Sequence, residues 1–462
     1  MHLKLDPGPS ANIAPPIDSE GRHSRVGYWH ETIDITPGKP LEENLSCDVA
    51  VVGAGYTGLS TAYYLKKLKP ELDVVVLDSA VVGHCASGRN GGFVMPLLGW
   101  DLLYTVKKLG EEKGREAYTL MYDAIDHARH LIREHEIECD MEETGYLCLN
   151  PSDARERRSR EEFELAHRLG FEHDWLEGED LAEHVRSDTF VSGIFDPRPF
   201  VMNPAKLARG LKTLVEKTGV RVYEQTPLLE LKDDDPVWLR TPGGEIRAKQ
   251  VMLAVNGFGP ALGFMSSRIL PAHTFIVLTE PLTSEQLETV AWGRKRTSLE
   301  SSRNLIHYFR LTADNRALFG GEDAKLYFGG RYVERDEAVF EALKNRFRAY
   351  FPPLADVKFT HEWGGILAVT LDMFPTFGSH GERGNIFFGG GYSGHGVALS
   401  IYSGAILAPQ MLRAIGATDE AKTQLPFFYD RRPAWLGFEP FRYLGALAYR
   451  SILRTQDRIN KA

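Results

Sequence analysis

The order of hydrophobic and polar positions predicts a mixed α/β protein that begins with a strand–helix–strand unit. Apolar runs at 48–52 and 73–78 are typical of buried strands, and the helical spacing between them ends near Leu68. Further strands are predicted at 145–149, 220–225, 249–255, 271–279 and 305–311, and further helices at 111–135, 153–169 and 334–350. This order predicts a discontinuous Rossmann-like nucleotide-binding domain with an inserted, largely antiparallel second domain.

The breaks between these segments set the expected domain boundaries. We expect a nucleotide-binding domain at 46–98, 191–264 and 361–415, and a substrate domain at 99–190 and 265–360. Residues 1–45 are expected to form an N-terminal arm, because residues 1–24 are rich in Pro, Ser and Gly and lack periodicity. Residues 416–462 are expected to form a helical extension. Its apolar stripe favours packing on its own domain, although a basic amphipathic helix is also typical of a membrane surface or a partner contact.

Composition narrows the class without deciding it. The chain has 462 residues, of which 43% are hydrophobic and 25% charged, as in globular proteins. Its formal net charge of −9 argues against a nucleic-acid partner. Four irregularly spaced cysteines predict neither a disulfide framework nor a metal site. No apolar run approaches the ~20 residues of a membrane span, and no signal pattern opens the chain, so we expect a cytoplasmic location. The oligomeric state stays open.

The turn after the first strand has the G-x-G-x-x-G spacing of a dinucleotide site. Gly53 permits a tight exit from the strand, Gly55 permits close approach of a pyrophosphate, and Gly58 permits close packing of helix on sheet. Asp78 closes the next strand twenty residues after Gly58, where an acid binds a ribose hydroxyl. FAD and NAD sites share this pattern, so it does not choose between them.

A second glycine-rich segment follows that acid at residues 86–92. Its glycines, together with Ser87 and Asn90, leave N–H groups exposed, and Arg89 adds a guanidinium. Such groups suit a second contact with a pyrophosphate or with the edge of an isoalloxazine ring. An NAD domain usually continues into another helix and strand instead. The segment therefore favours FAD, and a flexible surface turn is the alternative.

A third glycine segment repeats the strand–turn–helix design near the C-terminus. An apolar strand reaches Phe388, a run of glycines follows, and a helical pattern begins at Val397. A helix N-terminus at this place would face the carbonyl end of a flavin and stabilise negative charge on it. A tight structural turn with His395 pointing outward is the alternative.

These segments together resemble the D-amino-acid-oxidase-like FAD superfamily, which includes glycine and sarcosine oxidases. Within it, the likeness is greatest to the gamma-glutamylputrescine oxidoreductase group of amine oxidoreductases. The resemblance spans about residues 25–460 and includes further motifs at 203–204, 307–312, 319–321, 362–365 and 391–397. It implies a FAD domain, and it implies that residues 394–397 contact the flavin or border the substrate cavity.

The candidate cofactor-binding residues lie in the three glycine segments or at the ends of nearby strands. They are Gly53, Gly55, Tyr56, Thr57, Gly58, Asp78, Ser87, Arg89, Asn90, Gly91, Gly92, Leu228, Asn256, Gly257, Gly391, Gly394, His395, Gly396 and Val397. No metal ligand is expected among them.

Two departures from the superfamily pattern concern flavin attachment and substrate. In sarcosine oxidases a Cys precedes a T-x-D stretch, but Gly365 stands at that place here, so we expect non-covalent FAD. Those enzymes also hold a carboxylate with a Lys just after the S-G-H-G loop, where this chain has Ala398. An unpaired carboxylate in an apolar cavity is costly. The chain is therefore expected to favour amines without an adjacent carboxylate, or substrates held by another cation.

Four residues are candidates for the chemistry: Tyr308, Arg310, His273 and His395. Alternation along 307–310 places Tyr308 and Arg310 on one strand face, where Tyr308 would orient an amine and Arg310 would supply a cation. A structural Tyr/Arg pair explains the same pattern. His273 is a candidate base or oxygen-activating group, although a lone His in an apolar strand is more often structural.

The leading hypothesis is a FAD-dependent amine oxidoreductase. It would oxidise a C–N bond by hydride transfer to the flavin N5, giving an imine and then an aldehyde plus an amine, with O2 as the expected acceptor. One alternative is a flavin dehydrogenase of an amino acid or N-alkyl amino acid that uses a different acceptor. The other is a flavin-binding protein without turnover.

Overall fold

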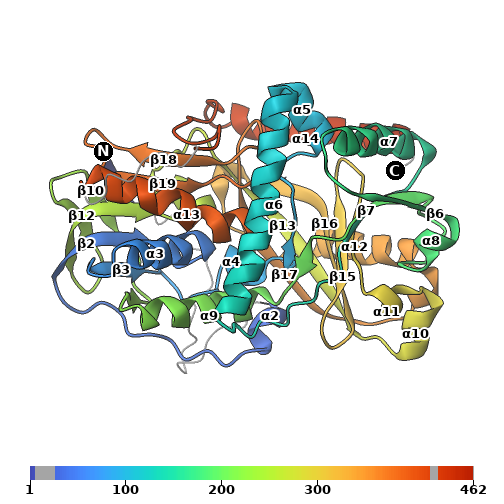
Figure 1. Cartoon of the computed structure of the whole chain (residues 1–462), viewed down its shortest axis with the longest axis horizontal. Helices are drawn as coiled ribbons and strands as arrows, with labels where there is room; N and C mark the ends of the chain where they lie inside the picture. Colours follow the sequence, from blue (N-terminus) through green and yellow to red (C-terminus); the bar gives the residue numbers. More distant parts are fainter. Residues whose placement is uncertain (6–26, 417–424, 461–462) are drawn as a thin grey trace.

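The chain folds into two large β-sheets that lie side by side with helices around them (Figure 1). The computed structural model describes residues 1–5, 27–416 and 425–460. The first sheet has the order β1 (His2–Lys4), β10 (Glu230–Lys232), β11 (Val237–Arg240), β12 (Glu245–Leu253), β2 (Leu45–Val52), β3 (Val74–Leu77) and β9 (Arg221–Tyr223), with β19 (Ile386–Gly390) on β12 and β18 (Thr376–His380) on β19.

The central strands of the first sheet run parallel. They are β9, β3, β2, β12 and β19, whereas β1, β10, β11 and β18 pair antiparallel. Parallel strands carry the loops at their carboxyl ends on one edge of the sheet. The turns that follow β2, β3, β12 and β19 therefore meet at that edge, and these turns hold the glycine segments.

The second sheet has eight strands and faces that edge. Its order is β17 (Phe359–Val369), β13 (Leu270–Pro281), β16 (Arg316–Leu326), β15 (His307–Leu311), β14 (Ser298–Ser301), β5 (Tyr146–Asn150), β7 (Ser192–Asp196) and β6 (Asp174–Glu177). All its neighbours pair antiparallel except β14 with β5. A short ribbon of β4 (Phe93–Val94) and β8 (Phe200–Val201) lies beside the two sheets.

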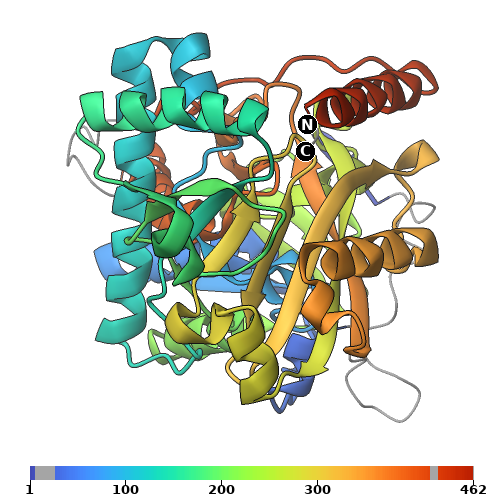
Figure 2. The same ribbon diagram turned by 90° about the vertical axis from the view of Figure 1, so that its right-hand side faces the viewer.

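The helices cover both sheets. In chain order they are α2 (Tyr28–Glu31), α3 (Tyr56–Leu68), α4 (Ala86–Arg89), α5 (Leu102–Leu109), α6 (Glu111–Glu134), α7 (Asp153–Arg168), α8 (Gly178–Ala182), α9 (Pro204–Lys217), α10 (Ser284–Thr289), α11 (Trp292–Lys295), α12 (Glu337–Tyr350), α13 (Val397–Ala414) and α14 (Phe441–Ile459), with short 3-10 turns at Asn256–Leu262, Phe328–Gly330 and Pro352–Leu354. Turned by 90°, the molecule shows α14 at the top of the view and α12 beside the second sheet (Figure 2). The mixed α/β fold class is confirmed.

Strand pairing and helix packing differ from the expected domain boundaries at three elements. Strand β7 falls within 191–264 and β17 begins just before 361, yet both belong to the second sheet. In the other direction, α6 falls within 99–190 but buries its apolar stripe in the core that α3 and α13 share. Sequence order does not reveal these assignments, because a strand's partners are set by long-range pairing.

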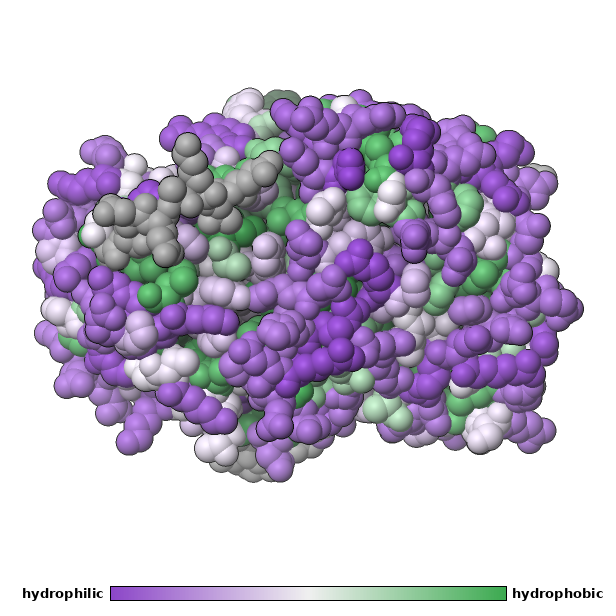
Figure 3. Space-filling model, viewed as in Figure 1, coloured by the Kyte–Doolittle hydropathy of each residue, from purple (hydrophilic) through white to green (hydrophobic). Residues whose placement is uncertain are grey.

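The two chain ends are partly built into the fold. Residues 2–4, expected in a loose arm, pair with β10, and the expectation for 6–24 lies outside the described residues. Helix α14 packs over loops of the second domain, where Asp457 accepts hydrogen bonds from Arg155 at 2.5 Å and from the Asn304 N–H at 2.9 Å. Hydrophilic residues dominate the face in Figure 3. None of the helices in the described part of the chain combines the length and apolar character that a membrane span needs.

Helices α3 and α13 cross in unusually close contact. A Cβ at Gly404 of α13 would lie 2.2 Å from the Ser60 carbonyl oxygen of α3, so only glycine fits there. The Gly404 N–H donates to the Ser60 hydroxyl at 3.0 Å, and that hydroxyl donates to the Ile401 carbonyl at 2.5 Å. The contact fixes the N-terminal ends of both helices relative to each other.

We expect Gly404→Ala to destabilise the fold, because the added methyl group forces α3 and α13 apart. Overpacking of this kind costs about 1–3 kcal/mol, which thermal unfolding followed by circular dichroism will show as a lower Tm. Gly445→Ala is the matched control, because a Cβ at Gly445 in α14 meets no atom within 4 Å. Equal midpoints for the two variants would contradict this account of the crossing.

Candidate active site

The turn between β2 and α3 presents backbone rather than side chains at the sheet edge. Gly53 has a φ of +102°, which only glycine adopts readily. A Cβ at Gly58 would lie 1.9 Å from the Gly53 carbonyl oxygen. The two glycines let α3 begin directly against β2, so the N–H groups at its N-terminus suit a phosphate.

Asp78 holds the same turn from the end of β3. Its carboxylate accepts the N–H groups of Ala54 at 2.7 Å and Ala80 at 2.9 Å. Burial raises the pKa of Asp78 to about 6; Glu224 adds to the rise and the two N–H donors oppose it. Leu228 belongs to the buried apolar cluster that also contains the last residues of β2 and β3. Asp78 is thus a buried acid at the place where the motif requires one.

The second glycine segment repeats the geometry of the first. It forms the short helix α4, and a Cβ at Gly88 would lie 1.8 Å from the Gly83 carbonyl oxygen. The Ser87 hydroxyl accepts the Tyr56 N–H at 3.0 Å, so the two segments touch. The Tyr56 side chain points elsewhere, since its hydroxyl donates to the Pro204 carbonyl at 2.9 Å.

Two tryptophans hold the second segment in place. The Trp29 indole donates to the Asn90 carbonyl at 2.9 Å, and the Trp363 indole donates to the Arg89 carbonyl at 2.8 Å. The Asn90 side chain stabilises its own turn, because its oxygen accepts the Gly92 N–H at 2.8 Å. Trp29 and His30 of α2 are therefore buried, although they fall in the expected N-terminal arm at 1–45.

The Arg89 guanidinium binds other side chains of the protein. It pairs with the Glu334 carboxylate at 2.9 Å and donates to the Tyr332 hydroxyl at 2.8 Å, while its side chain is almost fully buried at the cavity wall. The sequence predicted that Arg89 would contact a phosphate or a flavin edge. In the structure Glu334 balances the charge of Arg89.

The loops that follow β12 and β19 are joined at the same edge. The Asn256 side-chain oxygen accepts the Gly391 N–H at 3.1 Å. Gly257 lies against β17, where a Cβ would come within 3.0 Å of the Ile366 side chain. These contacts connect the third glycine segment to both sheets.

The third segment also reaches the N-terminus of α3. The Tyr392 and Thr57 hydroxyls lie 2.6 Å apart, and Gly396 caps α13. Gly394, His395, Gly396 and Val397 line the cavity described next. The three glycine segments, far apart in sequence, thus surround one place.

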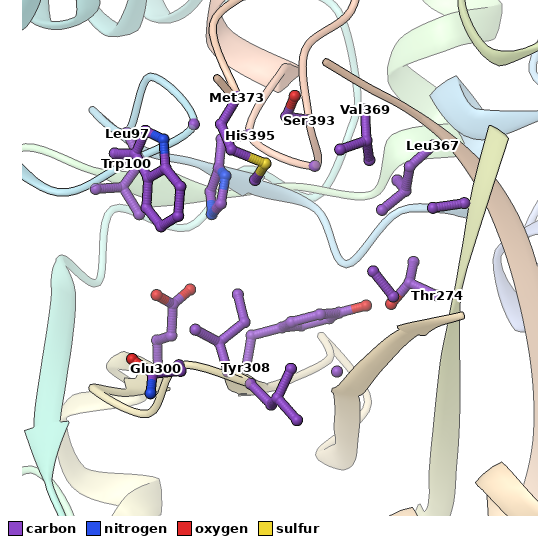
Figure 4. Close-up of a pocket in the computed structure, with 18 of the residues that line it drawn as sticks. Leu97, Trp100, Thr274, Glu300, Tyr308, Leu367, Val369, Met373, Ser393 and His395 are labelled. Carbon is purple, nitrogen blue, oxygen red and sulfur yellow. The ribbon is translucent and has the colours of Figure 1, made fainter. Parts of the chain in front are cut away.

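A cavity of about 930 Å³ lies between the glycine segments and the second sheet. The second sheet supplies Thr274, Glu300, Tyr308, Leu367 and Val369. Leu97, Trp100 and Met373 lie across the cavity from Glu300 and Tyr308 (Figure 4). Helix α14 closes one side with Tyr449 and Leu453. A mostly apolar cavity with a few polar groups is typical of a small-molecule site.

His395 projects into this cavity (Figure 4). Burial lowers the pKa of His395 to about 4, so its ring is neutral at pH 7. Its Nδ1 is buried and has no hydrogen-bond partner among the described residues.

Tyr308 lies flat on β16 and lines the cavity. A Cβ at Gly320 would come within 2.4 Å of the Tyr308 ring, so glycine makes room for the ring. Its hydroxyl points towards Thr274 (Figure 4). Burial raises the pKa of Tyr308 to about 12, so the hydroxyl stays protonated and can donate a hydrogen bond.

Arg310 shares the strand face of Tyr308, as alternation predicts, but does not line the cavity. Its guanidinium donates to the Gly92 carbonyl at 3.2 Å and the Met202 carbonyl at 2.9 Å, and it lies 5.3 Å from the Trp29 ring centre. Burial lowers the pKa of Arg310 to about 10. The structure places Arg310 as a support for the second glycine segment and not beside a substrate.

His273 faces away from the cavity. Its neighbours Ala272 and Thr274 line the cavity, and alternation along β13 turns His273 to the other side. There its Nε2 accepts the Val333 N–H at 3.2 Å, and its ring packs near Tyr332. Burial lowers the pKa of His273 to about 4. It is therefore not brought together with Tyr308 and His395.

Glu300 is a cavity residue that sequence reasoning missed. It is 6% exposed, and burial raises its pKa to about 7, although a hydrogen bond from the Tyr146 hydroxyl at 3.0 Å opposes the rise. The short strand Ser298–Ser301 gave no periodicity signal, but one acid between buried strand residues was a clue. Sequence reasoning also missed Trp100 and Thr274, because neither residue belongs to a motif.

With this geometry in place, comparison with known proteins assigns the family. Residues 48–410 match the DAO family, FAD dependent oxidoreductase, and the chain belongs to that family. Gamma-glutamylputrescine oxidoreductase of Escherichia coli is 32% identical over 434 residues, which cover 92% of this chain and 97% of that protein. The resemblance drawn from the glycine segments is confirmed.

Solved structures of flavoenzymes share the fold. Glycine oxidase from Geobacillus kaustophilus has a TM-score of 0.71 at 20% identity, covering 84% of this chain and 100% of that one. L-proline dehydrogenase from P. horikoshii has a TM-score of 0.65 at 18% identity, covering 83% and 96%. The protein is therefore a FAD-dependent oxidoreductase that acts on amines or amino acids.

The residues present fit FAD. The backbone cradle at 53–58 leaves no space for a Cβ at Gly58, and His395 lines the cavity beside it. Gly365 lies on β17 with no atom within 4 Å of a Cβ built there, so the place where sarcosine oxidases carry their Cys is an open stretch of strand. The four cysteines Cys47, Cys85, Cys139 and Cys148 are free and lie elsewhere.

We expect acid precipitation of the purified protein to release all of its FAD into the supernatant, because no Cys stands at 365. Absorbance of the supernatant and of the redissolved pellet measures the two fractions. Flavin that stays with the pellet through washing would overturn the expectation of non-covalent binding.

We expect Glu300 to make stability depend on pH. Folding raises the pKa of Glu300 from 4.5 to about 7. The contribution of its protonated carboxyl to the free energy of unfolding is therefore fully present below pH 4.5 and is lost as the pH rises through about 7. The Tm of Glu300→Gln should therefore exceed that of the wild type increasingly over this window. Glu285→Gln, at an exposed helix position, is the control and should show no such trend. A difference that is constant with pH would contradict the buried carboxyl.

Proposed function

We propose that the protein is an amine oxidase that breaks a C–N bond and releases an aldehyde. When bound, FAD would supply the hydride acceptor for the carbon beside the amine nitrogen, and O2 would be the final electron acceptor. Water then hydrolyses the imine product to the aldehyde and an amine. The observation that carries this proposal is an apolar cavity that borders residues 394–397 and holds no lysine at 398.

The charges around the cavity support an amine over an α-amino acid. Ala398 is buried where sarcosine oxidases hold a carboxylate, and Arg310 is occupied by backbone carbonyls. Three of the arginines that line the cavity form close ion pairs, Arg89 with Glu334, Arg155 with Asp457 and Arg158 with Asp101. Arg303 also lines the cavity; it lies 3.9 Å from Asp457, and its Nε and Nη1 have no hydrogen-bond partner among the described residues. An amino acid carboxylate beside Arg89, Arg155 or Arg158 would compete with an existing ion pair, which is costly.

The cavity also favours the neutral form of the amine that reacts. Hydride leaves the carbon as the nitrogen lone pair forms the imine, and a protonated amine has no free lone pair. Apolar walls disfavour the charged ammonium. The protonated Tyr308 hydroxyl can donate a hydrogen bond that orients the nitrogen, and the neutral His395 ring adds no positive charge beside it.

The names of the relatives agree with this choice. The Escherichia coli relative, similar along nearly the whole chain, is named for a putrescine derivative, which is an amine. The structural neighbours named for glycine and L-proline are at most 20% identical and share the fold. We therefore place this chain with the amines.

We expect anaerobic mixing of the holoenzyme with amines to bleach the visible flavin band, whereas α-amino acids and N-alkyl glycines should bleach it at least about tenfold more slowly. The rate should rise with pH as the amine loses its proton. Product aldehyde, trapped after aerobic turnover, confirms C–N cleavage.

Two outcomes would contradict the proposal. Bleaching by amino acids alone would favour the dehydrogenase or amino acid oxidase alternative. Slow reaction of the reduced enzyme with O2 in stopped flow, together with fast reaction with a quinone, would replace the oxidase by a dehydrogenase.

A further inference from the structure

One row of side chains crosses the cavity side of the second sheet. Strand register pairs Cys148 of β5 with Glu300 of β14, Glu300 with Tyr308 of β15, and Tyr308 with Gly320 of β16. Cys148, Glu300 and Tyr308 all line the cavity. Glu300 is the one ionisable carboxylate in this row, and it sits directly beside the tyrosine that we assign to the reacting amine.

Glu300 lacks a cationic partner. The Tyr146 hydroxyl, at 3.0 Å, is its hydrogen-bond donor, and no ion pair to Glu300 occurs in the part of the chain that the structure describes. The side chain is nevertheless almost fully buried. A buried carboxylate with one neutral donor is costly to the fold.

Most other buried acids have more partners than Glu300, although Glu162 of the same cavity also shows no ion pair among the described residues and accepts the Leu102 N–H at 3.1 Å. Asp457 has Arg155 at 2.5 Å, and the Asp78 carboxylate has two backbone N–H donors. The Asp196 carboxylate accepts from the Tyr122 hydroxyl at 2.7 Å and from the Arg198 N–H at 2.9 Å. Glu300 faces the cavity beside Tyr308, so its partner is to be sought among the molecules that bind there.

The orientation of Glu300 separates it from the reacting end. Figure 4 shows its carboxylate directed towards the space below Trp100 and His395, while the Tyr308 hydroxyl points the other way, to Thr274. His395 is neutral, so no positive ring opposes a cation in this space. The side chains between the two ends are mainly apolar and suit a chain of methylene groups.

We propose that Glu300 determines substrate specificity by binding a second positive charge of the amine, an ammonium group that an aliphatic spacer separates from the nitrogen being oxidised. This inference rests on the proposed amine oxidase function. The reacting nitrogen itself is not the partner of Glu300, because a carboxylate beside it would hold it in the protonated, unreactive form. The substrate class is therefore an aliphatic diamine or a longer polyamine-like amine.

The test compares α,ω-diamines with n-alkylamines of the same chain length. For wild-type holoenzyme, kcat/KM for the best diamine should exceed that of its matched monoamine by about 10- to 100-fold, as expected for a hydrogen bond to a charged group. In Glu300→Gln this ratio should fall to about one, through a higher KM for the diamine, with kcat within about threefold. Monoamine turnover should stay unchanged or improve.

Two controls isolate the charge. Glu300→Asp keeps the carboxylate on a shorter side chain and should retain part of the preference. Glu285→Gln removes an exposed glutamate of the same domain and should leave the ratio at the wild-type value. FAD content and Tm of every variant report folding.

Binding without turnover separates this proposal from the proposed function. Titration of the oxidised, anaerobic holoenzyme with diamine and monoamine, by calorimetry, should show the diamine binding about 10- to 100-fold more tightly in the wild type and equally in Glu300→Gln. If no amine reduces the flavin but this binding difference holds, the function fails and the cation site stands. Equal binding of both amines by the wild type, or an equal loss of kcat for both amines in Glu300→Gln, would overturn the site.

Discussion

The close packing of α13 on α3 is the contact on which the rest of the site depends. Gly404 lies on Ser60 without room for a Cβ, and the hydroxyls of Thr57 and Tyr392 meet 335 positions apart in sequence. This contact brings the first and third glycine segments to one edge of a parallel sheet, and the loops after β3 and β12 reach the same edge because their strands run in the same direction. The cavity exists because the second sheet covers that edge.

Charge is distributed unevenly around this cavity. Three arginines in its wall, Arg89, Arg155 and Arg158, are neutralised by acids from other elements, so they hold segments together. The groups that face the interior are kept in their neutral forms by burial, as His395 and Tyr308 are. Glu300 differs because no ion pair matches its burial in the part of the chain that the structure describes. Glu300 is therefore a place in this interior where a positive charge of a ligand would be stabilised.

The glycine segments were predictable because their signal is local. A positive φ at Gly53 or the missing Cβ at Gly58 is a property of a few consecutive residues, and the strand and helix on either side confirm the context. The roles of single side chains were less predictable. Arg310 was predicted to bind the substrate as a cation, but its guanidinium donates a hydrogen bond to the Gly92 carbonyl of the second glycine segment.

By itself, the sequence determined the mixed α/β class, the FAD cofactor and the reaction family, because glycine turns and strand periodicity depend on residues that are close in the sequence. Only the tertiary structure decided which side chains meet a substrate. Whether His273 points into the cavity depends on which face of β13 the cavity occupies. Glu300 could be recognised as a cavity residue only from the pairing of β5 and β15 on either side of its short strand. Those pairings join residues far apart in the chain, and a side chain's burial and partners follow from them rather than from its own neighbours.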